Sequence, residues 1–402
     1  IFQTVPSLHE RENVCLDLIR NVVVLATGGT RGVTAELLRE LAAPGNTLLL
    51  TGRSPLPEEE PGHLQRLTTP LVLRQHFISE VRNGNLQMTP AEIQRKVQFI
   101  IAAREMRYNI NDFKQRGAYV QYYAVDVTNE EAMCRLFNTI YKQYSEISGV
   151  VHGAGIIEDK LLADKMSDSW SRVVETKVIG FLLLQKYLRP ESLRFLTVLS
   201  SVAGRYGNSG QTDYATANEL MNRLCCQISR IWGNRVNVKA LCWGPWGTTE
   251  SGAGMVTEDS EAKFARKGVT LVSAEVGRRL FKDELTHSGS ANIEIICGEG
   301  PWEQHEAAIG RIERDSQAVI DKVLYPLIDH TNVITLSQGD KSISFCLDEN
   351  HAYLQEHCID NVPVMPAAVA LEIMSEAACY LWPGWHVVEA RDFRLLKGVV
   401  LE

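Results

Sequence analysis

The chain has 402 residues, of which 45% are apolar and 22% are charged, and its net charge is −8. This apolar share is ample for a large core and more than one domain, whereas a nucleic-acid-binding surface would need a basic excess that the chain lacks. No apolar run reaches the roughly 18 residues that span a bilayer, and the chain starts at Ile1, so we expect no membrane span and either a piece of a longer protein or a matured chain.

Short apolar runs alternate with helix-like segments over the first three quarters of the chain. VVVLA at 22–26 and LLLTGR at 48–53 are continuous apolar runs, typical of strands buried on both faces. Further strands are predicted at 120–126, 149–155, 195–201 and 237–244. Helical patterns separate them, at 130–144, at about 168–188 and from Tyr214 onward. The alternation predicts an α/β fold, a Rossmann-like doubly wound parallel sheet with right-handed crossovers.

Two parts of the chain depart from this alternation. Residues 57–115 are polar, rich in Gln, Arg and Glu, and helically spaced, which predicts a helical insertion between the second and third strands. The alternation stops near residue 303, and a different unit begins at 346. The predicted organisation is an N-terminal segment at 1–20, a nucleotide-binding domain at 21–303, a linker at 304–345 and a partial domain at 346–402.

The nine cysteines are scattered along the chain. Their number is odd and no CxxC pair occurs, which argues against a disulfide framework and against a zinc site. We therefore expect a reducing, cytoplasmic compartment and no bound metal.

The first glycine-rich segment, TGGTRG at 27–32, follows a predicted strand and opens a predicted helix, as a phosphate-binding turn requires. Glycine allows a positive φ and lets the backbone approach a pyrophosphate, whose charge then meets the helix N-terminus. The spacing is not GxGxxG, so a tight turn without a ligand is the alternative. The residues predicted to contact a cofactor here are Thr27, Gly28, Gly29, Thr30, Arg31 and Gly32.

The next three predicted strands also end in candidate nucleotide-binding residues. Arg53 stands where an acidic residue would bind the ribose of NAD, so its cation favours the 2′-phosphate of NADPH; a plain surface charge is the alternative. Asp126, followed by Val127, is placed to accept a hydrogen bond from adenine. HGAG ends the fourth strand and is predicted to pass under the adenosine; its candidate residues are Gly153, Ala154 and Gly155. All four features lie where open α/β sheets bind ligands.

Ser201 and Tyr214 are thirteen residues apart, a spacing that suits two side chains converging on one carbonyl oxygen. Ketone reduction requires a hydride at carbon and a proton at oxygen. A Tyr hydroxyl with a pKa of about 10 can give that proton when a Lys ammonium stabilises the tyrosinate, and a Ser hydroxyl can stabilise the developing negative charge. In the commonest enzymes of this kind the Lys lies four residues after the Tyr, but that residue is Asn218 here.

Over about 20–303 the chain resembles the ketoreductase domain of multienzyme polyketide and fatty-acid synthases, within the short-chain dehydrogenase/reductase superfamily. The segments that carry the resemblance are TGGTRG, TGRS, DVT, GVVHGAG, VVETKVIG, SSVAGRYGNSGQTDYATAN and CWGPWG. In those domains Lys and Asn exchange positions, and Lys177 stands at the family's Lys position. The catalytic set that the resemblance implies is Lys177, Ser201, Tyr214 and Asn218. A solvated helix Lys is the alternative for Lys177. The resemblance also implies that Pro245 and Trp246 border the nicotinamide, before a substrate lid that follows residue 248.

Within that family the chain is most similar to the iterative synthases of polyunsaturated fatty acids and enediynes. The helical insertion and the form GGTRGVTAE carry this similarity, and Thr34 in place of Gly fits the same branch. Residues 157–159 stand where an LDD motif marks reductases that give the D-3-hydroxy product, and Tyr206 stands where a Trp marks the opposite class. The resemblance therefore favours a 3R product.

HCIDNVPVMP at 357–366 resembles the HxxxGxxxxP motif that opens the dehydratase domain of the same synthases, a double hot-dog fold. The resemblance implies that His357 is the dehydratase base and that the apolar helix at 367–381 is the one a hot-dog sheet wraps around; a structural histidine is the alternative. Asn361 replaces the usual Gly, a mild change because Asn tolerates a left-handed turn. The partner acid lies downstream in the family, so dehydration by this chain alone is not expected.

The sequence therefore predicts an NADPH-dependent reductase of 3-oxoacyl thioesters carried on an acyl carrier protein, followed by the start of a dehydratase, a partial α+β hot-dog segment. The expected partners are the carrier protein and other domains of the same synthase, with a dimer as a further possibility. One alternative is a non-catalytic scaffold domain that positions a neighbouring dehydratase. The other is a free-standing reductase of small ketones.

Overall fold

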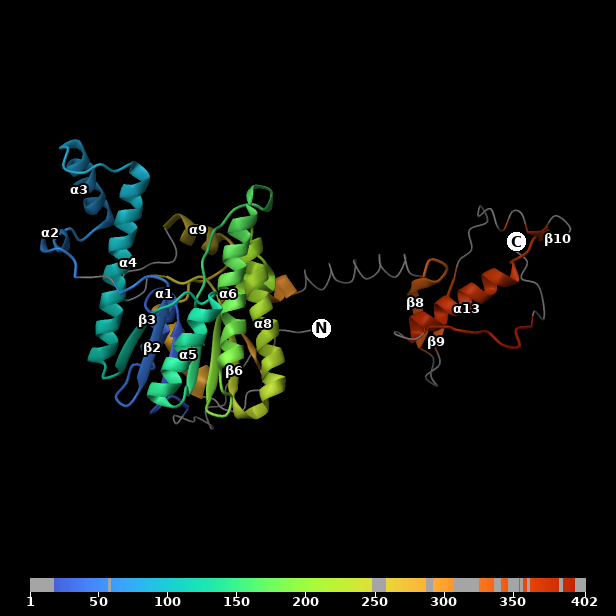
Figure 1. Ribbon diagram of the computed structural model, residues 1–402. Helices are drawn as coiled ribbons and strands as arrows, with labels where there is room; N and C mark the ends of the chain where they lie inside the picture. Colours follow the sequence, from blue (N-terminus) through green and yellow to red (C-terminus); the bar gives the residue numbers. More distant parts are fainter. Residues whose placement is uncertain are drawn as a thin grey trace. The chain divides into compact units, whose positions relative to one another are not determined.

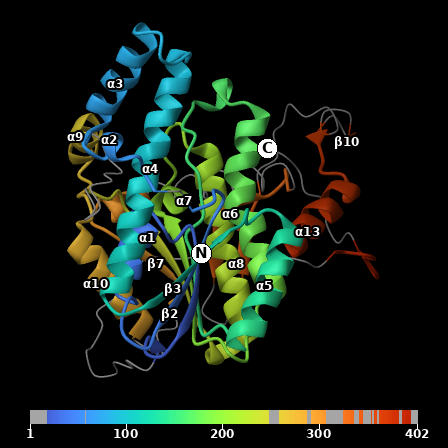
Figure 2. The same cartoon turned by 60° about the vertical axis from the view of Figure 1, so that its left-hand side comes forward.

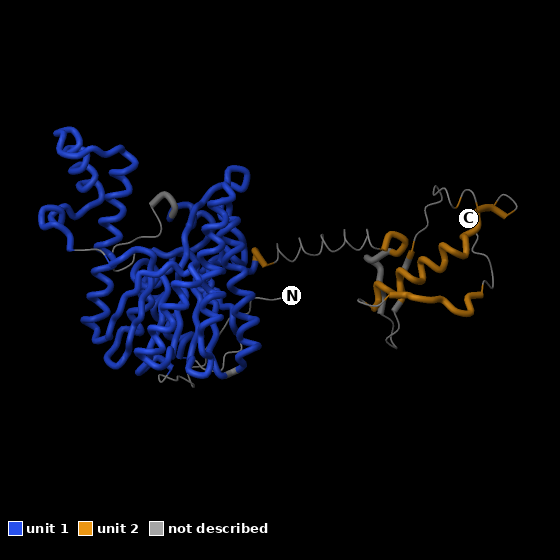
Figure 3. The backbone as a smooth tube through the Cα atoms, viewed as in Figure 1, with its two compact units in different colours: residues 1–303 blue, residues 304–402 orange. Residues whose placement is uncertain are grey.

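The computed structural model describes residues 18–56, 59–247, 258–286, 292–306, 325–335, 341–345, 354, 357–359, 362–382 and 386–394. The chain divides into two compact units, residues 1–303 and residues 304–402 (Figure 3). The division falls where the sequence predicts the end of the nucleotide-binding domain. Most of the predicted N-terminal segment and the start of the predicted substrate lid, residues 248–257, lie outside the described residues. No helix among the described residues is long and apolar enough to cross a membrane.

The first unit is built on a seven-stranded sheet in the order β3-β2-β1-β4-β5-β6-β7, with every neighbouring pair parallel (Figure 1). Its strands are β1 Val23–Thr27, β2 Thr47–Gly52, β3 Tyr119–Ala124, β4 Gly149–His152, β5 Phe195–Ser201, β6 Asn237–Trp243 and β7 Glu294–Cys297. The strand order reverses beside β1, and open α/β sheets bind ligands beyond the carboxyl ends of the strands at such a point. The predicted Rossmann-like doubly wound sheet is confirmed, and β7 is an addition to it.

Helices cover both faces of this sheet (Figure 2). They are α1 Gly32–Leu38, α5 Glu130–Tyr144, α6 Ser167–Tyr187, α8 Thr212–Trp232 and α10 Ala274–Thr286. Two further helices of this unit are α7 Val202–Tyr206 and α9 Glu258–Arg266. Alternate residues of a strand point to opposite faces. Accordingly, Val24 and Ala26 belong to one core cluster with α1 and α10, and Leu25 belongs to a second with α5, α6 and α8. The continuous apolar runs in the sequence follow from this burial on both faces.

Between β2 and β3 the chain forms α2 Gly62–Gln65, α3 Pro70–Arg82 and α4 Pro90–Gln115. Helix α4 begins at a capping box, in which Thr89 N donates to Glu92 and Glu92 N donates to Thr89 Oγ1. Helices α2 and α3 and the first half of α4 pack around a small core of their own and project away from the sheet (Figure 1).

The predicted insertion at 57–115 is helical, but its last turns do not belong to an insertion. Ile110 and Phe113 of α4 are buried in the core that covers the sheet. Parallel strands require a crossover connection, usually a helix, and the end of α4 is the crossover between β2 and β3. The added part therefore ends within α4.

The second unit contains β8 Asp329–Thr335, β9 Lys341–Ser344, β10 Cys358–Ile359, β11 Val362–Pro363 and α13 Ala367–Leu381. Helix α13 has the predicted bounds, and Ile373 on it packs with Ile328 and Met365 in a small core. Strands β8 and β9 form one antiparallel pair, and β10 and β11 form another.

Two sequence-based expectations for this unit were wrong. The antiparallel pair β8–β9 occupies part of the predicted linker at 304–345, because short strands of mixed polarity give little apolar signal. The stretch VVEARDFRLLKGVVLE, which begins at residue 387, is strand-like in sequence, but the structure forms no strand over 387–394, where Val388 is 95% exposed. A strand needs a partner strand and a buried face, and this segment has neither among the described residues. Residues 395–402 lie outside the described part.

Candidate active site

The turn between β1 and α1 lies very close to the backbone of the segment that follows β4. Gly28 has φ +69°, and a Cβ atom there would lie 3.0 Å from the carbonyl oxygen of Gly153 and 3.1 Å from Ala154 Cα. Gly32 has φ +58°. An L side chain at position 28 would be both strained and crowded. The TGGTRG turn therefore lies directly against the HGAG segment, so these two predicted cofactor segments are neighbours.

Helix α4 holds this turn from outside. The backbone N–H of Gly32 donates to Glu105 Oε1 at 2.8 Å, and Asn109 Nδ2 donates to the carbonyl oxygen of Thr30 at 3.0 Å. Asn109 is buried and accepts in turn from Arg39 Nη2 at 2.9 Å. These contacts were not predicted from the sequence, since nothing in a polar helical segment marks which residues will face a turn more than seventy positions earlier.

A buried chain of hydrogen bonds links the glycine turn to Lys177. Thr27 Oγ1 lies 2.7 Å from His152 Nδ1 and accepts from Ala154 N at 3.2 Å, while His152 Nε2 lies 2.9 Å from the carbonyl oxygen of Lys177. A carbonyl oxygen only accepts, so His152 carries its proton on Nε2 and accepts at Nδ1 from the Thr27 hydroxyl. His152 is the first residue of HGAG and was not among the predicted site residues.

Small residues let the segment after β4 pass close to two helices. A Cβ atom at Gly153 would come within 2.1 Å of Thr34 Oγ1 on α1. A Cβ atom at Gly155 would lie 3.0 Å from Lys177 Cε on α6. A side chain at position 153 would clash with Thr34, and one at position 155 would press against Lys177, so the two glycines let the segment pass between α1 and α6.

The predicted adenosine-binding residues lie at the carboxyl ends of neighbouring strands. Arg31 and Arg53 are both exposed, after β1 and β2 respectively. Burial raises the pKa of Tyr122 on β3, and the nearby charge of Arg31 opposes that shift. Asp126 is exposed and accepts from the backbone N–H of Thr128 at 2.9 Å. Arg31 and Arg53 thus lie exposed to solvent at the carboxyl end of the sheet.

Val127, the remaining residue predicted at this strand end, is buried. A Cβ atom at Gly180 of α6 would lie 3.0 Å from Val127 Cγ2 and 3.2 Å from His152 Cε1. Val127 therefore packs against α6 beside the histidine of the buried hydrogen-bond chain.

The four predicted catalytic residues come from three elements: Lys177 from α6, Ser201 from the end of β5, and Tyr214 and Asn218 from α8. Lys177 Nζ lies 5.9 Å from the centroid of the Tyr214 ring and donates to the carbonyl oxygen of Leu199 at 2.8 Å. Asn218 Nδ2 donates to the Tyr214 carbonyl oxygen at 2.7 Å. The structure thus places Lys177 beside the ring of Tyr214, and Asn218 one turn after it on α8.

The titration of this group follows from its burial. Burial raises the pKa of the Tyr214 phenol, and hydrogen bonds from the side chains of Asn218 and Ser201 oppose the rise. Burial lowers the pKa of the Lys177 ammonium to about 8. Burial and the charge of Lys177 lower the pKa of His152 to about 3, so this imidazole is neutral near pH 7. The site therefore combines a half-buried phenol with an amine that exchanges protons near neutral pH.

One polar atom in this group is left for a ligand or water. Asn218 is fully buried, and its Oδ1 has no hydrogen-bond partner among the described residues. Buried polar atoms are nearly always paired, so an unpaired acceptor beside Tyr214 indicates that something else completes its hydrogen bonding.

Pro245 and Trp246 lie just after β6. The Trp246 ring is 2% exposed and packs edge-on against Trp243, with centroids 5.1 Å apart. A Cβ atom at Gly277 of α10 would come within 2.1 Å of that ring. The carbonyl oxygen of Pro245 accepts from Val272 N at 2.8 Å. The structure therefore uses the Trp246 ring as core packing that anchors the segment leading to residue 248.

His357 lies in the second unit, where its side chain is exposed. His357 Nδ1 lies 2.8 Å from the carbonyl oxygen of Val364, whose N–H donates to the carbonyl oxygen of His357 at 3.0 Å. These contacts fix the residue at the base of the β10–β11 pair. Among the described residues, no group of three or more His, Cys, Asp or Glu side chains is arranged to hold a metal ion.

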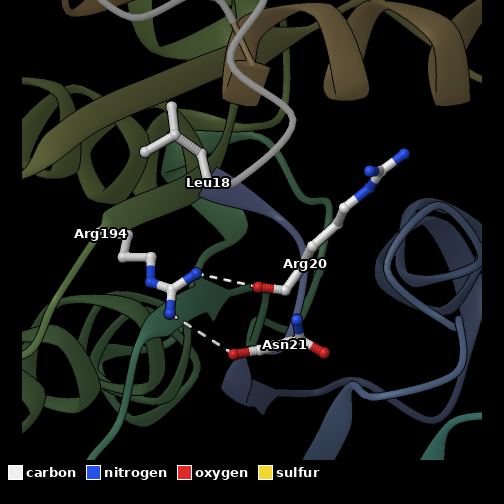
Figure 4. A pocket seen from close by; sticks show the side chains of 4 residues that line it. All are labelled: Leu18, Arg20, Asn21 and Arg194. Carbon is white, nitrogen blue, oxygen red and sulfur yellow. Dashed lines mark hydrogen bonds between the residues drawn. The ribbon is translucent and has the colours of Figure 1, made fainter.

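A separate pocket of about 560 Å³ lies at the opposite end of the sheet (Figure 4). It is lined by Leu18, Arg20, Asn21 and Arg194, residues that precede β1 and β5. Arg194 donates to the carbonyl oxygen of Arg20 at 2.9 Å. The predicted cofactor and catalytic residues, by contrast, gather where the strands end, so this pocket is not part of the candidate active site.

The family assignment rests on more than half of the chain. The sequence profile of the KR domain family matches residues 22–248, from the start of β1 to just beyond β6. The chain belongs to the KR domain family. Residues 22–248 are accordingly a ketoreductase domain, an oxidoreductase of the kind found in polyketide and polyunsaturated-fatty-acid synthases.

Known proteins similar to this KR domain are large synthases. A polyunsaturated fatty acid synthase component of Thraustochytrium sp. is 28% identical over 388 residues, which cover 94% of this chain and 12% of that protein. Polyketide synthase PksN of Bacillus subtilis is 26% identical over 332 residues, which cover 75% of this chain and 5% of that protein. The KR domain chain thus spans only a small part of these relatives.

Solved structures show the same fold. A ketoreductase domain from the bacillaene assembly line matches with a TM-score of 0.55 and 22% identity, over 72% of this chain and 58% of that one. A short chain dehydrogenase from Burkholderia cenocepacia, solved in complex with NADP, matches with a TM-score of 0.51 and 15% identity, over 70% of this chain and 98% of that one. At these identities the likeness concerns the fold of the KR domain alone.

Proposed function

We propose that this KR domain uses NADPH to reduce a 3-oxoacyl thioester, carried on an acyl carrier protein, to the 3-hydroxyacyl thioester within a multienzyme synthase. The observation that carries the proposal is the half-buried phenol of Tyr214 with the Lys177 ammonium 5.9 Å from its ring. A phenol paired with an amine is a proton donor for a carbonyl oxygen, which is the half of ketone reduction that the protein must supply. The other half is hydride transfer to the carbonyl carbon, and the KR family assignment supports it.

The residues at the carboxyl ends of the strands fit a dinucleotide. Position 28 has no room for a side chain, so a cofactor can approach the backbone of the turn there. Arg31 and Arg53 are exposed beside it and supply charge for a 2′-phosphate, which favours NADPH over NADH. A bound nicotinamide would supply the hydride. The chain's residues that would hold the cofactor are those of TGGTRG, TGRS, Asp126 and HGAG.

The proposed mechanism assigns each catalytic residue one task. The Ser201 hydroxyl donates to the substrate carbonyl oxygen and stabilises the negative charge that develops there. The Tyr214 hydroxyl gives its proton to the same oxygen. The Lys177 ammonium stabilises the resulting phenolate. Asn218 orients the first turn of α8 through its bond to the Tyr214 carbonyl oxygen, and its free Oδ1 is placed to hold a water that returns the proton.

Two features keep Lys177 where this mechanism needs it. Its ammonium donates to the Leu199 carbonyl oxygen on β5, and its own carbonyl oxygen accepts from His152. The second contact continues through Thr27 to the glycine turn. One buried chain of hydrogen bonds thus connects the cofactor turn with the catalytic amine. It fixes the position of Lys177 relative to the proposed cofactor site.

The resemblance to large synthases supports the substrate and the role of the second unit. The relatives are a polyunsaturated fatty acid synthase and a polyketide synthase, so the substrate proposed here is a carrier-bound acyl chain. The 3R product is proposed from residues 157–159 and Tyr206. The second unit is proposed to be the start of a dehydratase with the hot-dog fold, in which His357 would be the base. Its helix α13 and the β10–β11 pair that holds His357 are compatible with that interpretation.

The test is NADPH oxidation by the full chain with a 3-oxoacyl carrier protein and, in parallel, with a free small ketone. Faster turnover per enzyme on the carrier-bound substrate is the expected result. Turnover on the free ketone alone would favour a reductase of small metabolites, and no turnover on either substrate would favour a scaffold domain. Chiral analysis of the product tests the 3R assignment.

A further inference from the structure

An ion pair lies buried one residue before Tyr214. Lys165 Nζ contacts Asp213 Oδ1 at 2.5 Å, and the two side chains are 2% and 1% exposed. Lys165 lies in the β4–α6 loop, which we define as residues 153–166, and Asp213 lies in the first turn of α8. Lys and Asp are almost never this deeply buried unless they are paired. Such a pair is seldom retained for stability alone, because apolar residues of similar volume stabilise a core as well or better.

Two donors converge on Asp213, and one of them also contacts the loop backbone. Asp213 Oδ1 accepts from Lys165 and also from the backbone N–H of Tyr214 at 2.8 Å. Lys165 Nζ also donates to the carbonyl oxygen of Glu158 at 3.0 Å. The pair therefore connects the backbone of the β4–α6 loop directly to the backbone of the proposed proton donor.

The two oxygens of Asp213 differ in their contacts. Oδ2 is buried and has no hydrogen-bond partner among the described residues. Here the carboxylate is oriented by Lys165 and by Tyr214 N through a single oxygen, which fixes the direction of the Tyr214 backbone while leaving the other oxygen unpaired.

The same loop is joined twice more to the turn before Tyr214. Gln211 Nε2 donates to both carboxylate oxygens of Asp159, at 3.1 and 3.0 Å. The backbone N–H of Lys160 donates to the carbonyl oxygen of Gly210 at 2.9 Å. These two contacts lie near the surface, whereas the Lys165–Asp213 pair lies beneath them. The β4–α6 loop and the turn before Tyr214 are therefore connected by two hydrogen bonds near the surface and by the buried Lys165–Asp213 pair.

The β4–α6 loop also presents apolar side chains to solvent at this corner. Leu161, Leu162 and Met166 are 60%, 64% and 67% exposed. Exposed apolar residues gathered on one loop often mark a binding surface, and here they belong to the loop that is fastened to the catalytic tyrosine. Movement of this loop would therefore change the position of the tyrosine and of the surface beside it together.

We propose that the Lys165–Asp213 pair positions Tyr214, by fixing the β4–α6 loop to the first turn of α8 so that the phenol faces the substrate carbonyl. This inference rests on the proposed reductase function. Lys165 and Asp213 are positioning residues, since neither is assigned a contact with substrate or cofactor. Their loss should impair the chemical step and substrate use while leaving the cofactor site, which is built on other strand ends, intact.

The experiment compares Lys165→Met, Asp213→Asn and the double variant with the wild-type chain. The control is Lys186→Met, which removes a lysine from the same region of the chain, in α6, where its partner Glu130 is 56% exposed. The measurements are kcat and KM with a 3-oxoacyl carrier protein at saturating NADPH, Kd for NADPH by fluorescence, Tm, and hydrogen exchange of peptides covering 153–166 and 208–216.

Each single variant should lower kcat by about 10²-fold, the loss expected from misplacing a reacting group by about 1 Å. Kd for NADPH should stay within about twofold of wild type, since no cofactor-binding element is altered. Hydrogen exchange should rise in both peptides. The double variant leaves no unpaired buried charge, so its Tm should recover toward wild type while its kcat stays low. Lys186→Met should change none of these quantities.

Recovery of both Tm and kcat in the double variant would overturn the inference, because the pair would then be structural only. Unchanged hydrogen exchange in both peptides would overturn it as well, and that readout needs no turnover. If a single variant fails to fold, the double variant decides the question. A wild-type chain that reduces no ketone would contradict the proposed function, whereas the exchange data would still show whether the pair fastens the loop to α8.

Discussion

The ammonium of Lys177 lies 5.9 Å from the centre of the Tyr214 ring, although the two residues belong to different helices. Burial lowers the pKa of the amine to about 8 and raises the pKa of the phenol. The amine must be protonated to stabilise the phenolate. Turnover in the direction of reduction should therefore be constant below about pH 8 and decline above it, as Lys177 loses its proton.

Lys177→Met tests this assignment. The variant should lose about 10²–10⁴-fold in kcat, the usual contribution of acid–base catalysis. The decline near pH 8 should disappear from what activity remains. The measurement is kcat against pH from 6 to 10, with Lys186→Met on the same helix as the control. A Lys177→Met profile that keeps the wild-type decline would show that another group titrates there.

His152 should make the fold sensitive to acid. Its folded pKa is about 3, because of burial and of Lys177, whereas an unfolded histidine titrates near 6.5. Between these values the unfolded chain binds more protons, so the free energy of unfolding falls as pH drops from about 6.5, by up to about 1.4 kcal/mol per pH unit.

Urea unfolding of wild type and His152→Gln between pH 7 and 4 measures this effect. The variant should be less stable at pH 7, because a buried hydrogen-bond chain is broken, and its stability should fall less steeply toward acid. Equal slopes for the two proteins would contradict the assigned neutral state of His152.

Arg53→Ala should weaken NADPH binding by about 10- to 100-fold, the loss expected for charge-assisted hydrogen bonds, and should change NADH binding little. Arg53 is exposed at the end of β2, where it is available to a 2′-phosphate. The matched control is Arg135→Ala on α5, whose side chain is 70% exposed. Titration calorimetry with both cofactors gives the ratio of the Kd for NADPH to the Kd for NADH. A uniform loss for NADPH and NADH would show that Arg53 does not recognise the 2′-phosphate.

Gly153→Ala should destabilise the chain and weaken NADPH binding, because the new methyl group would lie 2.1 Å from Thr34 Oγ1. Overpacking of this kind costs about 1–3 kcal/mol. Thr34→Gly, which removes the whole side chain, should restore much of the loss when the two changes are combined. Tm and Kd for NADPH report both effects. Additive losses in the double variant would show that the contact with Thr34 is not the cause.

Strands buried on both faces are the part of the fold that the sequence predicts best. FLTVLSS forms β5 with the predicted bounds, because its apolar residues alternate sides of a sheet that is covered on both faces. β7 has only four residues, EIIC, too few for a period to be recognised. The pair β8–β9 mixes polar and apolar residues, and its pairing depends on a partner rather than on local pattern.

Contacts between distant segments are the part that sequence patterns do not reveal. The motifs indicated which residues to compare, and the structure shows Lys177 beside Tyr214. Nothing in the sequence marks that Glu105 on α4 meets the N–H of Gly32, or that Lys165 meets Asp213. Such polar pairs depend on how helices pack in three dimensions, and an isolated charged residue is more often a solvated one.

The most direct test of the proposed mechanism is the turnover of Tyr214→Phe, with NADPH and a 3-oxoacyl carrier protein. The variant keeps the ring and removes only the hydroxyl that gives the proton. We expect kcat to fall by about 10²–10⁴-fold while Kd for NADPH is retained. A variant that turns over at the wild-type rate would contradict the proposed role of Tyr214, and with it the mechanism.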